Sequence, residues 1–355
     1  MKKKPASRRG ARQKTSTPKD VIRMNYNENP YGMSESVKKA IYDATVGSYM
    51  YQDFFGVDLR REIADFHHLS EDHILIGSGS SASIDMIGEV FLNEGDEVVY
   101  GDPSYEAFPD MISDNGGVRV PVPLTSDYKF DLDAMRKAIT DKTKIVVIVN
   151  PNNPTGTCLH AKEVEKFIRS LPPTVIPVVD EAYIEYVDYE DHYSMIKLLQ
   201  EGYDRPLIVL RTFSKIYGLA GLRIGYAAAA PEVIDQLMKA CQAWNVGRNA
   251  QIAAYAALKD QAYVRKMFAI NREAREYLEE SLKDLGCRVV PTEANFIYFQ
   301  VPGRDSKEVK AYLADHKVQI GAPDAFNRVT VGTKEQNEVF LTLMREIVKR
   351  QRAIA

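Results

Sequence analysis

Short apolar runs alternate with segments of helical pattern between about residue 70 and residue 230. Such runs are typical of buried strands, whereas apolar residues spaced three and four apart predict helices, here Ser81–Leu92 and Ala161–Ser170. Strands that alternate with helices predict a mainly parallel sheet covered on both faces. The candidate strands are Ile74–Ile76, Glu97–Tyr100, Lys144–Val149, Val175–Val179, Leu207–Leu210 and Arg223–Ala227.

The last third of the chain follows a different order. A long helical pattern runs from Pro231 to about Leu285, and strand and helix patterns then alternate. This order predicts a smaller α+β domain beside an α/β domain. The later elements are strands Asn295–Phe299 and Arg328–Val331 and helices Lys307–His316 and Lys334–Arg352. We expect a basic tail over residues 1–20, an N-terminal segment over 21–47 that packs with the small domain, a large domain over 48–260 and a small C-terminal domain over 261–355.

Composition narrows the class of protein. A chain of 355 residues with 45% hydrophobic content can bury a sizeable core, and a net charge of −3 favours neither nucleic acid nor a membrane surface. Basic charge gathers in Met1–Lys19, which holds eight Lys or Arg and no acidic residue. We interpret this tail as disordered and solvated, with a weak nucleic-acid contact as the alternative.

The three cysteines Cys158, Cys241 and Cys287 stand far apart, without the spacing of metal ligands. They predict neither a disulfide framework nor a metal site, and they suit a reducing compartment. No stretch approaches the roughly 20 apolar residues that cross a bilayer. We therefore expect a soluble, cytoplasmic protein in which His67 and His68 are exposed.

One lysine follows a candidate strand at short distance. Lys215 comes after Leu207–Leu210, with Thr212 and Ser214 beside it and Arg223 eight positions on. Open α/β sheets bind ligands at the carboxyl edge of their strands. Partial burial or a nearby cation lowers the pKa of a lysine and makes the amine a usable nucleophile. The alternative is an ordinary surface lysine.

Two more strands end in groups that suit an anion or a planar ring. Gly77–Ser81 precedes a helix, so its backbone N–H groups and the hydroxyls of Ser80 and Ser81 form either a phosphate cradle or an ordinary helix N-cap. Tyr105, in Asp102-Pro103-Ser104-Tyr105, either stacks on a planar ligand or packs in the core.

Two further strands end in amide and carboxylate groups. Asn150–Gly156 follows a six-residue apolar strand, and its prolines and glycine fix the turn that carries Asn153. Asp180, followed by Glu181-Ala182-Tyr183, ends the next strand. A buried aspartate is costly unless it meets a cation or hydrogen-bond donors. Asp180 therefore pairs with a protonated ring nitrogen of a ligand, or it caps a helix or forms an ion pair within the protein.

A single ligand, pyridoxal 5′-phosphate, accounts for all five clusters. Its phosphate needs a cradle and a cation, its aldehyde a lysine, and its pyridinium nitrogen a carboxylate. Its ring needs a stacking partner, and its phenolic oxygen needs hydrogen bonds. Each cluster alone is a weak or moderate signal, and their occurrence together in one chain indicates this cofactor.

At these residues the chain resembles the fold-type I pyridoxal-phosphate aminotransferases of class I/II, and among them the histidinol-phosphate aminotransferase branch. The resemblance extends from Asn25–Gly32 to Arg328–Asn337. Its most specific parts are Asn150–Gly156, Asp180–Tyr183 and Thr212–Tyr226. It implies an α/β fold with a large, mainly parallel mixed-sheet cofactor domain and a smaller α+β C-terminal domain.

The resemblance also implies a role for each matching residue. Lys215 would hold the cofactor and shuttle a proton, Asp180 would pair with the pyridinium nitrogen, and Tyr183 would bond the phenolic oxygen together with Asn153. A tyrosine, Tyr51, would reach the phosphate in the neighbouring subunit, which implies a homodimer with shared active sites. The remaining assignments are Tyr105 to the ring, Ser80, Ser81, Thr212, Ser214 and Arg223 to the phosphate, and Arg328, Asn29, Tyr31 and Asn153 to the substrate.

Three positions depart from the family pattern. The usual Gly-Asn-Gly-Ser-Asp-Glu cradle is replaced by Gly77–Ala82, whose backbone N–H groups can still serve. Histidinol-phosphate members carry a second arginine about a dozen residues before the one matched by Arg328, and Val318–Asn327 contains none, which counts against a phosphorylated substrate. Arg248 either replaces that cation or, as we favour, is a solvated residue at a helix start.

We therefore expect an aminotransferase that moves the amino group of an aromatic or other bulky amino acid to a 2-oxo acid such as 2-oxoglutarate, in a ping-pong cycle through Lys215. Histidinol phosphate is the second candidate donor. A lyase or decarboxylase shares the cofactor residues and stays an alternative, because fold does not settle function. A regulatory protein without turnover is disfavoured, because Lys215, Asp180 and Arg223 are all present.

Overall fold

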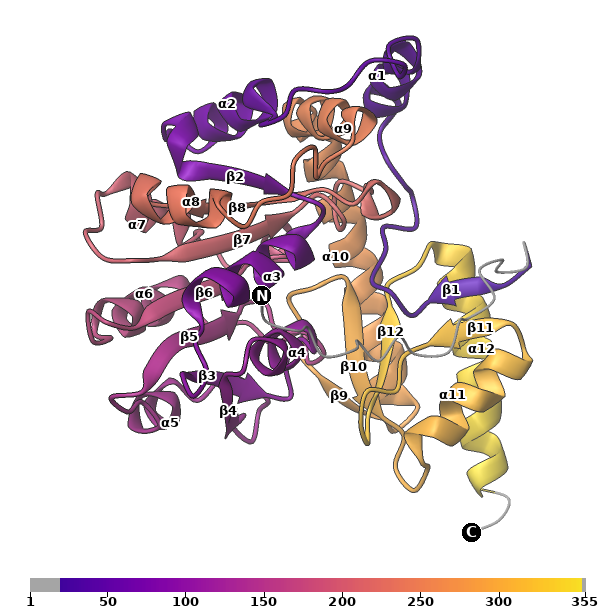
Figure 1. Cartoon of the computed structure of the whole chain (residues 1–355). Helices are drawn as coiled ribbons and strands as arrows, with labels where there is room; N and C mark the ends of the chain where they lie inside the picture. Colours follow the sequence, from indigo (N-terminus) through magenta and orange to yellow (C-terminus); the bar gives the residue numbers. More distant parts are fainter. Residues whose placement is uncertain (1–19, 353–355) are drawn as a thin grey trace.

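A seven-stranded mixed sheet forms the larger part of the protein, seen here in a computed structural model that describes residues 20–352 (Figure 1). Six strands share one direction and β8 runs against them, which confirms the predicted mainly parallel sheet. In spatial order the strands are β2 (Ile74–Gly77), β8 (Gly225–Ala229), β7 (Ile208–Thr212), β6 (Ile176–Asp180), β5 (Thr143–Val149), β3 (Glu97–Asp102) and β4 (Val118–Pro123).

The central strands are covered on both faces. Every residue of β6, β7 and β8 is buried. Because successive side chains of a strand point to opposite faces, this burial requires helices on either side of the sheet. Helix α3 packs against β2, β7 and β8, and α8 packs against β2.

Two strands differ from the sequence prediction. The strand expected at Arg223 begins instead at Gly225, because Arg223 has a left-handed backbone (φ 52°) that ends the preceding turn. The edge strand β4 has no apolar run, since it reads Val-Arg-Val-Pro-Val-Pro and is largely solvent-facing. Prolines are tolerated at a sheet edge, where an N–H group is not needed for pairing.

Side-chain caps begin several of the helices. Asp131, Asp260 and Asp305 each accept a backbone N–H of the first turn that follows. Pro231 occupies the first turn of α8, where its missing N–H costs nothing. The helices are α1 (Glu35–Thr45), α2 (Val57–Phe66), α3 (Ser80–Phe91), α4 (Ala107–Asp114), α5 (Leu132–Lys137), α6 (Ala161–Arg169), α7 (Ile196–Gln200), α8 (Pro231–Met238), α9 (Arg248–Lys259), α10 (Gln261–Asp284), α11 (Ser306–Asp315) and α12 (Lys334–Arg352).

The C-terminal third forms a smaller α+β unit beside the large sheet (Figure 1). A three-stranded antiparallel sheet has the order β12 (Asn327–Thr330), β10 (Phe296–Gln300), β9 (Arg288–Val290), and β1 (Ile22–Met24) pairs in parallel with β11 (Val318–Ile320). Separate hydrophobic clusters lie on the two sides. The long helix α10 connects them, because Val264 and Met267 belong to the large cluster and Leu278 and Leu282 to the small one.

The N-terminal segment contacts both parts. Met24 of β1 is buried in the cluster of the small unit, whereas α1 packs against α9 on the large side. The bounds expected for the four parts of the chain stay a prediction. The basic tail expected over residues 1–20 lies outside the described residues apart from Asp20, which pairs with Lys317.

His67 is buried, which makes the expected exposure of this residue wrong. Its Nε2 lies 2.8 Å from the hydroxyl of Tyr226, which belongs to β8. Burial, together with the positive charges of Arg211 and His68, lowers the pKa of His67 to about 3. Between residues 20 and 352, no helix has the length and apolar character needed to span a bilayer.

Candidate active site

Polar residues converge at the carboxyl edge of the large sheet. Because β2, β3, β5, β6 and β7 run in one direction, the segments that follow them reach the same edge. The antiparallel strand β8 starts at this edge and adds Arg223. Four predicted residues follow four of these strands and one ends the fifth: Ser80, Tyr105, Asn153 and Lys215 come after β2, β3, β5 and β7, and Asp180 is the last residue of β6.

Lys215 lies in the tight loop after β7 and is half-buried. Its Nζ donates to the carbonyl of Tyr26 at 3.3 Å and lies 5.2 Å from the centroid of the Tyr183 ring. The loop is closed by Gly218 (φ 73°), whose Cα meets the Gly32 carbonyl so closely that a Cβ would lie 2.1 Å from the carbonyl oxygen. The N-terminal segment thus covers the lysine.

Asp180 ends β6 and is 2% exposed. One carboxylate oxygen accepts the backbone N–H of Ala182 at 3.0 Å. Burial raises the pKa of Asp180 to about 7, although the Ala182 N–H and the charge of Lys215 act in the opposite direction. A carboxylate in this position is suited to pair with a cationic ligand atom.

A buried ion cluster anchors the loop that follows Asp180. The Arg211 guanidinium on β7 lies 3.5 Å from the Glu181 carboxylate and 2.7 Å from that of Glu185. Glu181 also accepts the Ser194 hydroxyl and the Met195 N–H. These contacts fix both ends of the segment that carries Tyr183. Sequence reasoning missed this cluster, because nothing local indicates that Arg211 faces inward.

The residues expected to hold a phosphate form an anion cradle. Ser80 and Ser81 begin α3, where backbone N–H groups point outward. Gly79 leaves room for a cation, since a Cβ there would lie 2.5 Å from Nη2 of Arg223. Nη1 of Arg223 lies 3.4 Å from the Ser214 hydroxyl. The Ser214 hydroxyl is in turn 2.9 Å from that of Thr212. Helix N-terminus, hydroxyls and guanidinium together suit a tetrahedral anion.

Arg328 on β12 reaches the same edge from the small unit. Its Nη1 donates to Asn153 Oδ1, and its Nη2 donates to the Asn25 carbonyl at 2.8 Å. Burial lowers the pKa of Arg328, and among the described residues its Nε has no hydrogen-bond partner. Gly321 pairs with Arg328 across the chain, and a Cβ at position 321 would lie 3.6 Å from the Cβ of Arg328. The position bridged to Arg328 is therefore a glycine and adds no second positive charge there.

Asn27 is a site residue that sequence reasoning did not single out. It is 2% exposed, and its Nδ2 donates to the Tyr183 hydroxyl at 3.0 Å. It lies within the Asn25–Gly32 motif, which marks the segment as important. The contact itself depends on a left-handed backbone (φ 56°) and on a partner 156 positions away, and neither is visible in the sequence.

Other predicted site residues lie farther out. Asn29 donates to the Ile216 carbonyl at 2.9 Å and so anchors the N-terminal segment beside Lys215. Tyr31 is 43% exposed, and Tyr51 is 80% exposed with its ring centroid 5.0 Å from that of Trp244. Arg248, expected to be solvated, is half-buried against Gly47 at the end of α1. The substrate and partner-subunit roles of Asn29, Tyr31 and Tyr51 stay predictions.

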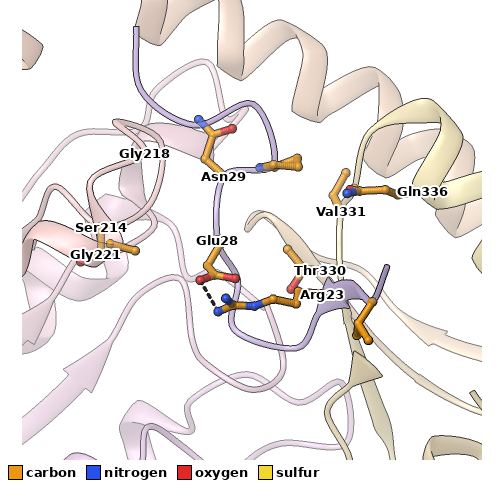
Figure 2. Close-up of a pocket in the computed structure, with 13 residues that line it drawn as sticks. Arg23, Glu28, Asn29, Ser214, Gly218, Gly221, Thr330, Val331 and Gln336 are labelled. Atoms are coloured by element: carbon orange, nitrogen blue, oxygen red, sulfur yellow. Dashed lines mark hydrogen bonds and ion pairs between the residues drawn. The ribbon is translucent and has the colours of Figure 1, made fainter. Parts of the chain in front are cut away.

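A cavity lined by both polar and apolar residues opens beside the lysine loop (Figure 2). It has a volume of about 360 Å³ and lies between the N-terminal segment, the loop at Ser214–Gly221 and the turn after β12. Arg23 and Glu28 line it as an ion pair at 2.7 Å, and Gln336 of α12 lines it beside Val331. Ser214, which belongs to the anion cradle, lines this cavity.

The mixed sheet, the lysine loop, the buried carboxylate and the anion cradle define a pyridoxal-phosphate-dependent enzyme of fold type I. The sequence profile of the family "Aminotransferase class I and II" matches residues 19–343, and the chain belongs to this family. It is thus a pyridoxal-phosphate-dependent aminotransferase, which confirms the cofactor and the reaction class predicted from the sequence.

The relatives are similar over nearly their whole length. The histidinol-phosphate aminotransferase of Moorella thermoacetica is 40% identical over 335 residues, which cover 93% of this chain and 86% of the relative. That of Brevibacillus brevis is 38% identical, with 93% and 91% covered. The histidinol-phosphate aminotransferase from Sinorhizobium meliloti, solved in complex with pyridoxal-5′-phosphate, superposes with a TM-score of 0.86 at 28% identity, with 94% and 92% covered.

The residues present fit this cofactor. The cradle of Ser80, Ser81, Ser214 and Arg223 suits the phosphate, and the buried Asp180 suits a protonated ring nitrogen. When bound, pyridoxal phosphate supplies an electron sink for the bond broken at the substrate Cα. Lys215, whose Nζ lies 5.2 Å from the centroid of the Tyr183 ring, is the residue that would hold the cofactor and accept a proton.

Proposed function

We propose that this aminotransferase takes its amino group from histidinol phosphate and passes it to a 2-oxo acid such as 2-oxoglutarate. The observation that carries the proposal is Arg328, a buried guanidinium at the carboxyl edge that is held by Asn153 and Asn25 and retains an unpartnered Nε. Such a group binds a substrate phosphate or carboxylate by charge-assisted hydrogen bonds. The similarity to histidinol-phosphate aminotransferases over 93% of the chain supports the phosphorylated donor.

Each side chain at the site has its own role in the two half-reactions. Lys215 would take up the proton from the donor Cα and hold it for the next transfer. Asp180 would pair with the ring nitrogen of the cofactor, whose electron sink would accept the pair left at Cα. The donor would give up its amino group and, with one water molecule, leave as a ketone. The acceptor would take the amino group, release a water molecule and leave as an amino acid. Arg328 orients both reactants by their anionic groups.

A second candidate donor is an amino acid with an aromatic or other bulky side chain. The sequence alone ranks this donor first, and one observation still favours it: the residue bridged to Arg328 is Gly321, which brings no second cation to that position. One cation suits a monoanionic carboxylate better than a phosphate dianion. The similarity to histidinol-phosphate aminotransferases supports histidinol phosphate over this second candidate.

We also propose that two copies form a homodimer. An exposed apolar patch covers the end of α1 and the loop before α2, where Val46, Tyr49 and Tyr51 are each at least 80% exposed. Trp244 extends this patch, since its ring lies 5.0 Å from Tyr51 and 5.2 Å from Phe54. Contiguous apolar surface of this kind marks an interface, and the predicted reach of Tyr51 into a neighbouring site makes a second copy the fitting occupant.

Steady-state kinetics with a panel of donors tests the proposed donor. We expect kcat/KM for histidinol phosphate to exceed that for phenylalanine, tyrosine and histidine by at least about 100-fold with 2-oxoglutarate as acceptor. Arg328→Met should reduce kcat/KM for histidinol phosphate by about 100-fold or more. A higher kcat/KM for an amino acid would assign the enzyme to the second candidate.

A further inference from the structure

Asn27 is fixed by hydrogen bonds on all four of its polar groups. Its backbone N–H donates to the Thr330 hydroxyl at 2.9 Å, and its carbonyl accepts Nδ2 of Asn295 at 3.1 Å. Its Oδ1 lies 3.3 Å from the same Thr330 hydroxyl, and its Nδ2 lies 3.0 Å from the Tyr183 hydroxyl. The asparagine therefore cannot rotate without breaking contacts to the β10–β12 sheet.

The orientation of this amide determines the direction of the Tyr183 proton. The Thr330 hydroxyl accepts the Asn27 N–H, so its own proton goes to Oδ1 of Asn27. This leaves Nδ2 facing Tyr183, and an amide nitrogen can only donate. The Tyr183 oxygen is thus an acceptor on this side, and within residues 20–352 no acceptor takes its proton.

Tyr183 is itself held in place. It is 3% exposed, and its ring packs edge-on against Phe296 at 5.2 Å. Lys215 lies over its ring at 5.2 Å, and Arg328 lies close enough for Tyr183 to act electrostatically on its guanidinium. With the ring fixed, the one adjustable feature is the direction in which the hydroxyl proton points.

We propose that Asn27 is a positioning residue that directs the hydroxyl proton of Tyr183 onto the phenolic oxygen of pyridoxal phosphate. A hydrogen bond to that oxygen stabilises its negative charge, so the nitrogen that links the cofactor to Lys215 holds its own proton less tightly. Donation from Asn27 polarises the Tyr183 O–H and strengthens the bond. Asn27 thereby lowers the pKa of the lysine-linked cofactor without touching it.

The inference rests on the predicted contact of Tyr183 with the phenolic oxygen and not on the identity of the donor. It is tested by absorbance titration of the cofactor-loaded enzyme against pH, with no donor present. Failure of the donor assignment would therefore leave this measurement unaffected. The variants are Asn27→Ala, Asn27→Asp, Tyr183→Phe and the double variant Asn27→Ala with Tyr183→Phe.

We expect Asn27→Ala to raise the pKa of the lysine-linked cofactor by about half to one unit. Asn27→Asp keeps the shape of the side chain but offers only acceptors, so it should raise the pKa at least as much. Tyr183→Phe should raise it as well, and adding Asn27→Ala to Tyr183→Phe should cause no further shift. Asn271→Ala, the loss of another buried asparagine whose amide donates to Ala294, should leave the pKa unchanged.

Three results would overturn the proposal. The first is a pKa of the lysine-linked cofactor that is unchanged or lowered in Asn27→Ala and Asn27→Asp. The second is a shift from Asn27→Ala that is equally large in the parent enzyme and in Tyr183→Phe. The third is an unchanged cofactor pKa in Tyr183→Phe. If Asn27→Ala fails to fold or to retain cofactor, Asn27→Asp carries the same comparison, alone and combined with Tyr183→Phe. Thermal unfolding of each loaded variant shows that the shift does not reflect a general loss of structure.

Discussion

Asp180 links the cofactor to the stability of the protein. Because burial raises its pKa to about 7, the folded cofactor-free protein holds a proton there that the unfolded chain releases above about pH 4. Between these two values the contribution of Asp180 to stability falls as pH rises. Pairing with the ring nitrogen of the cofactor offsets this loss.

Replacement of Asp180 by asparagine should therefore stabilise the cofactor-free enzyme at alkaline pH. We expect a gain on the order of a few kcal/mol at pH 8, shrinking towards zero near pH 4. The same variant should hold cofactor more weakly and react much more slowly. Denaturant unfolding of both cofactor-free proteins at several pH values measures the gain. A cofactor-free variant less stable than the parent at pH 8 would contradict the burial argument.

Lys215 should be indispensable for covalent attachment of the cofactor. Lys215→Ala removes the only amine placed in the described site over Tyr183, so the absorbance band of the lysine-linked cofactor should be lost. Turnover should fall by several orders of magnitude, because no other group there is positioned to move the Cα proton. Lys317→Ala, at a surface ion pair with Asp20, is the matched control. Normal turnover in Lys215→Ala would refute the assignment.

At the level of single residues, the sequence predicts the position of polar side chains that end or directly follow a buried strand. Lys215 and Asp180 could be found because a polar group after a buried apolar run must lie at the sheet edge. Asn27, Arg211 and His67 could not, because their contacts join positions 26 to 159 residues apart. A buried partner of this kind leaves no periodic signal along the chain.

At the level of elements, the apolar pattern predicts the buried strands and misses the short or exposed ones. β5, β6 and β7 are near-continuous apolar runs and were expected within two residues of their observed bounds. β1, β9 and β11 have only three residues each, so they carry no detectable alternation. The pairing of β1 with β11 depends on tertiary packing around Met24 and Val318, which both lie in the core of the small unit.

The turn between β11 and β12 is where donor selectivity can be altered. Gly321→Arg would add a second cation beside Arg328, and Gly321→Ala would add only the Cβ. We expect Gly321→Arg to raise kcat/KM for histidinol phosphate by about 10-fold relative to Gly321→Ala, with little change for amino-acid donors. Steady-state kinetics of the two variants decides this. An equal change for both donor classes would show that position 321 does not face the phosphate.

At the level of the whole molecule, the N-terminal segment joins two cores. β1 pairs with β11 of the small unit, α1 packs on α9 of the large one, and the residues between them cover Lys215. The resemblance implied both units, but the parallel pairing of β1 with β11 spans almost 300 residues and has no local signature. The patch at the end of α1 remains exposed in a single chain.

The assembly proposed above can be disrupted at Trp244. Trp244→Glu should convert a dimer to a monomer at micromolar concentration, because a charge would be buried within the apolar patch beside Tyr51 and Phe54. Val339→Glu is the matched control, since Val339 is similarly exposed (42% against 45%) but lies on α12. Sedimentation velocity distinguishes the two states. A monomeric parent protein, or a Trp244→Glu variant that stays dimeric, would contradict the proposed interface.

The most direct test of the account is a single half-reaction followed by absorbance. Cofactor-loaded enzyme is mixed with histidinol phosphate in the absence of any acceptor, and 2-oxoglutarate is added afterwards. We expect histidinol phosphate to remove the absorbance band of the lysine-linked cofactor and to give one equivalent of ketone product. Addition of 2-oxoglutarate should restore the band fully. Release of a different product, or a band that histidinol phosphate leaves unchanged while an aromatic amino acid removes it, would contradict the proposed donor.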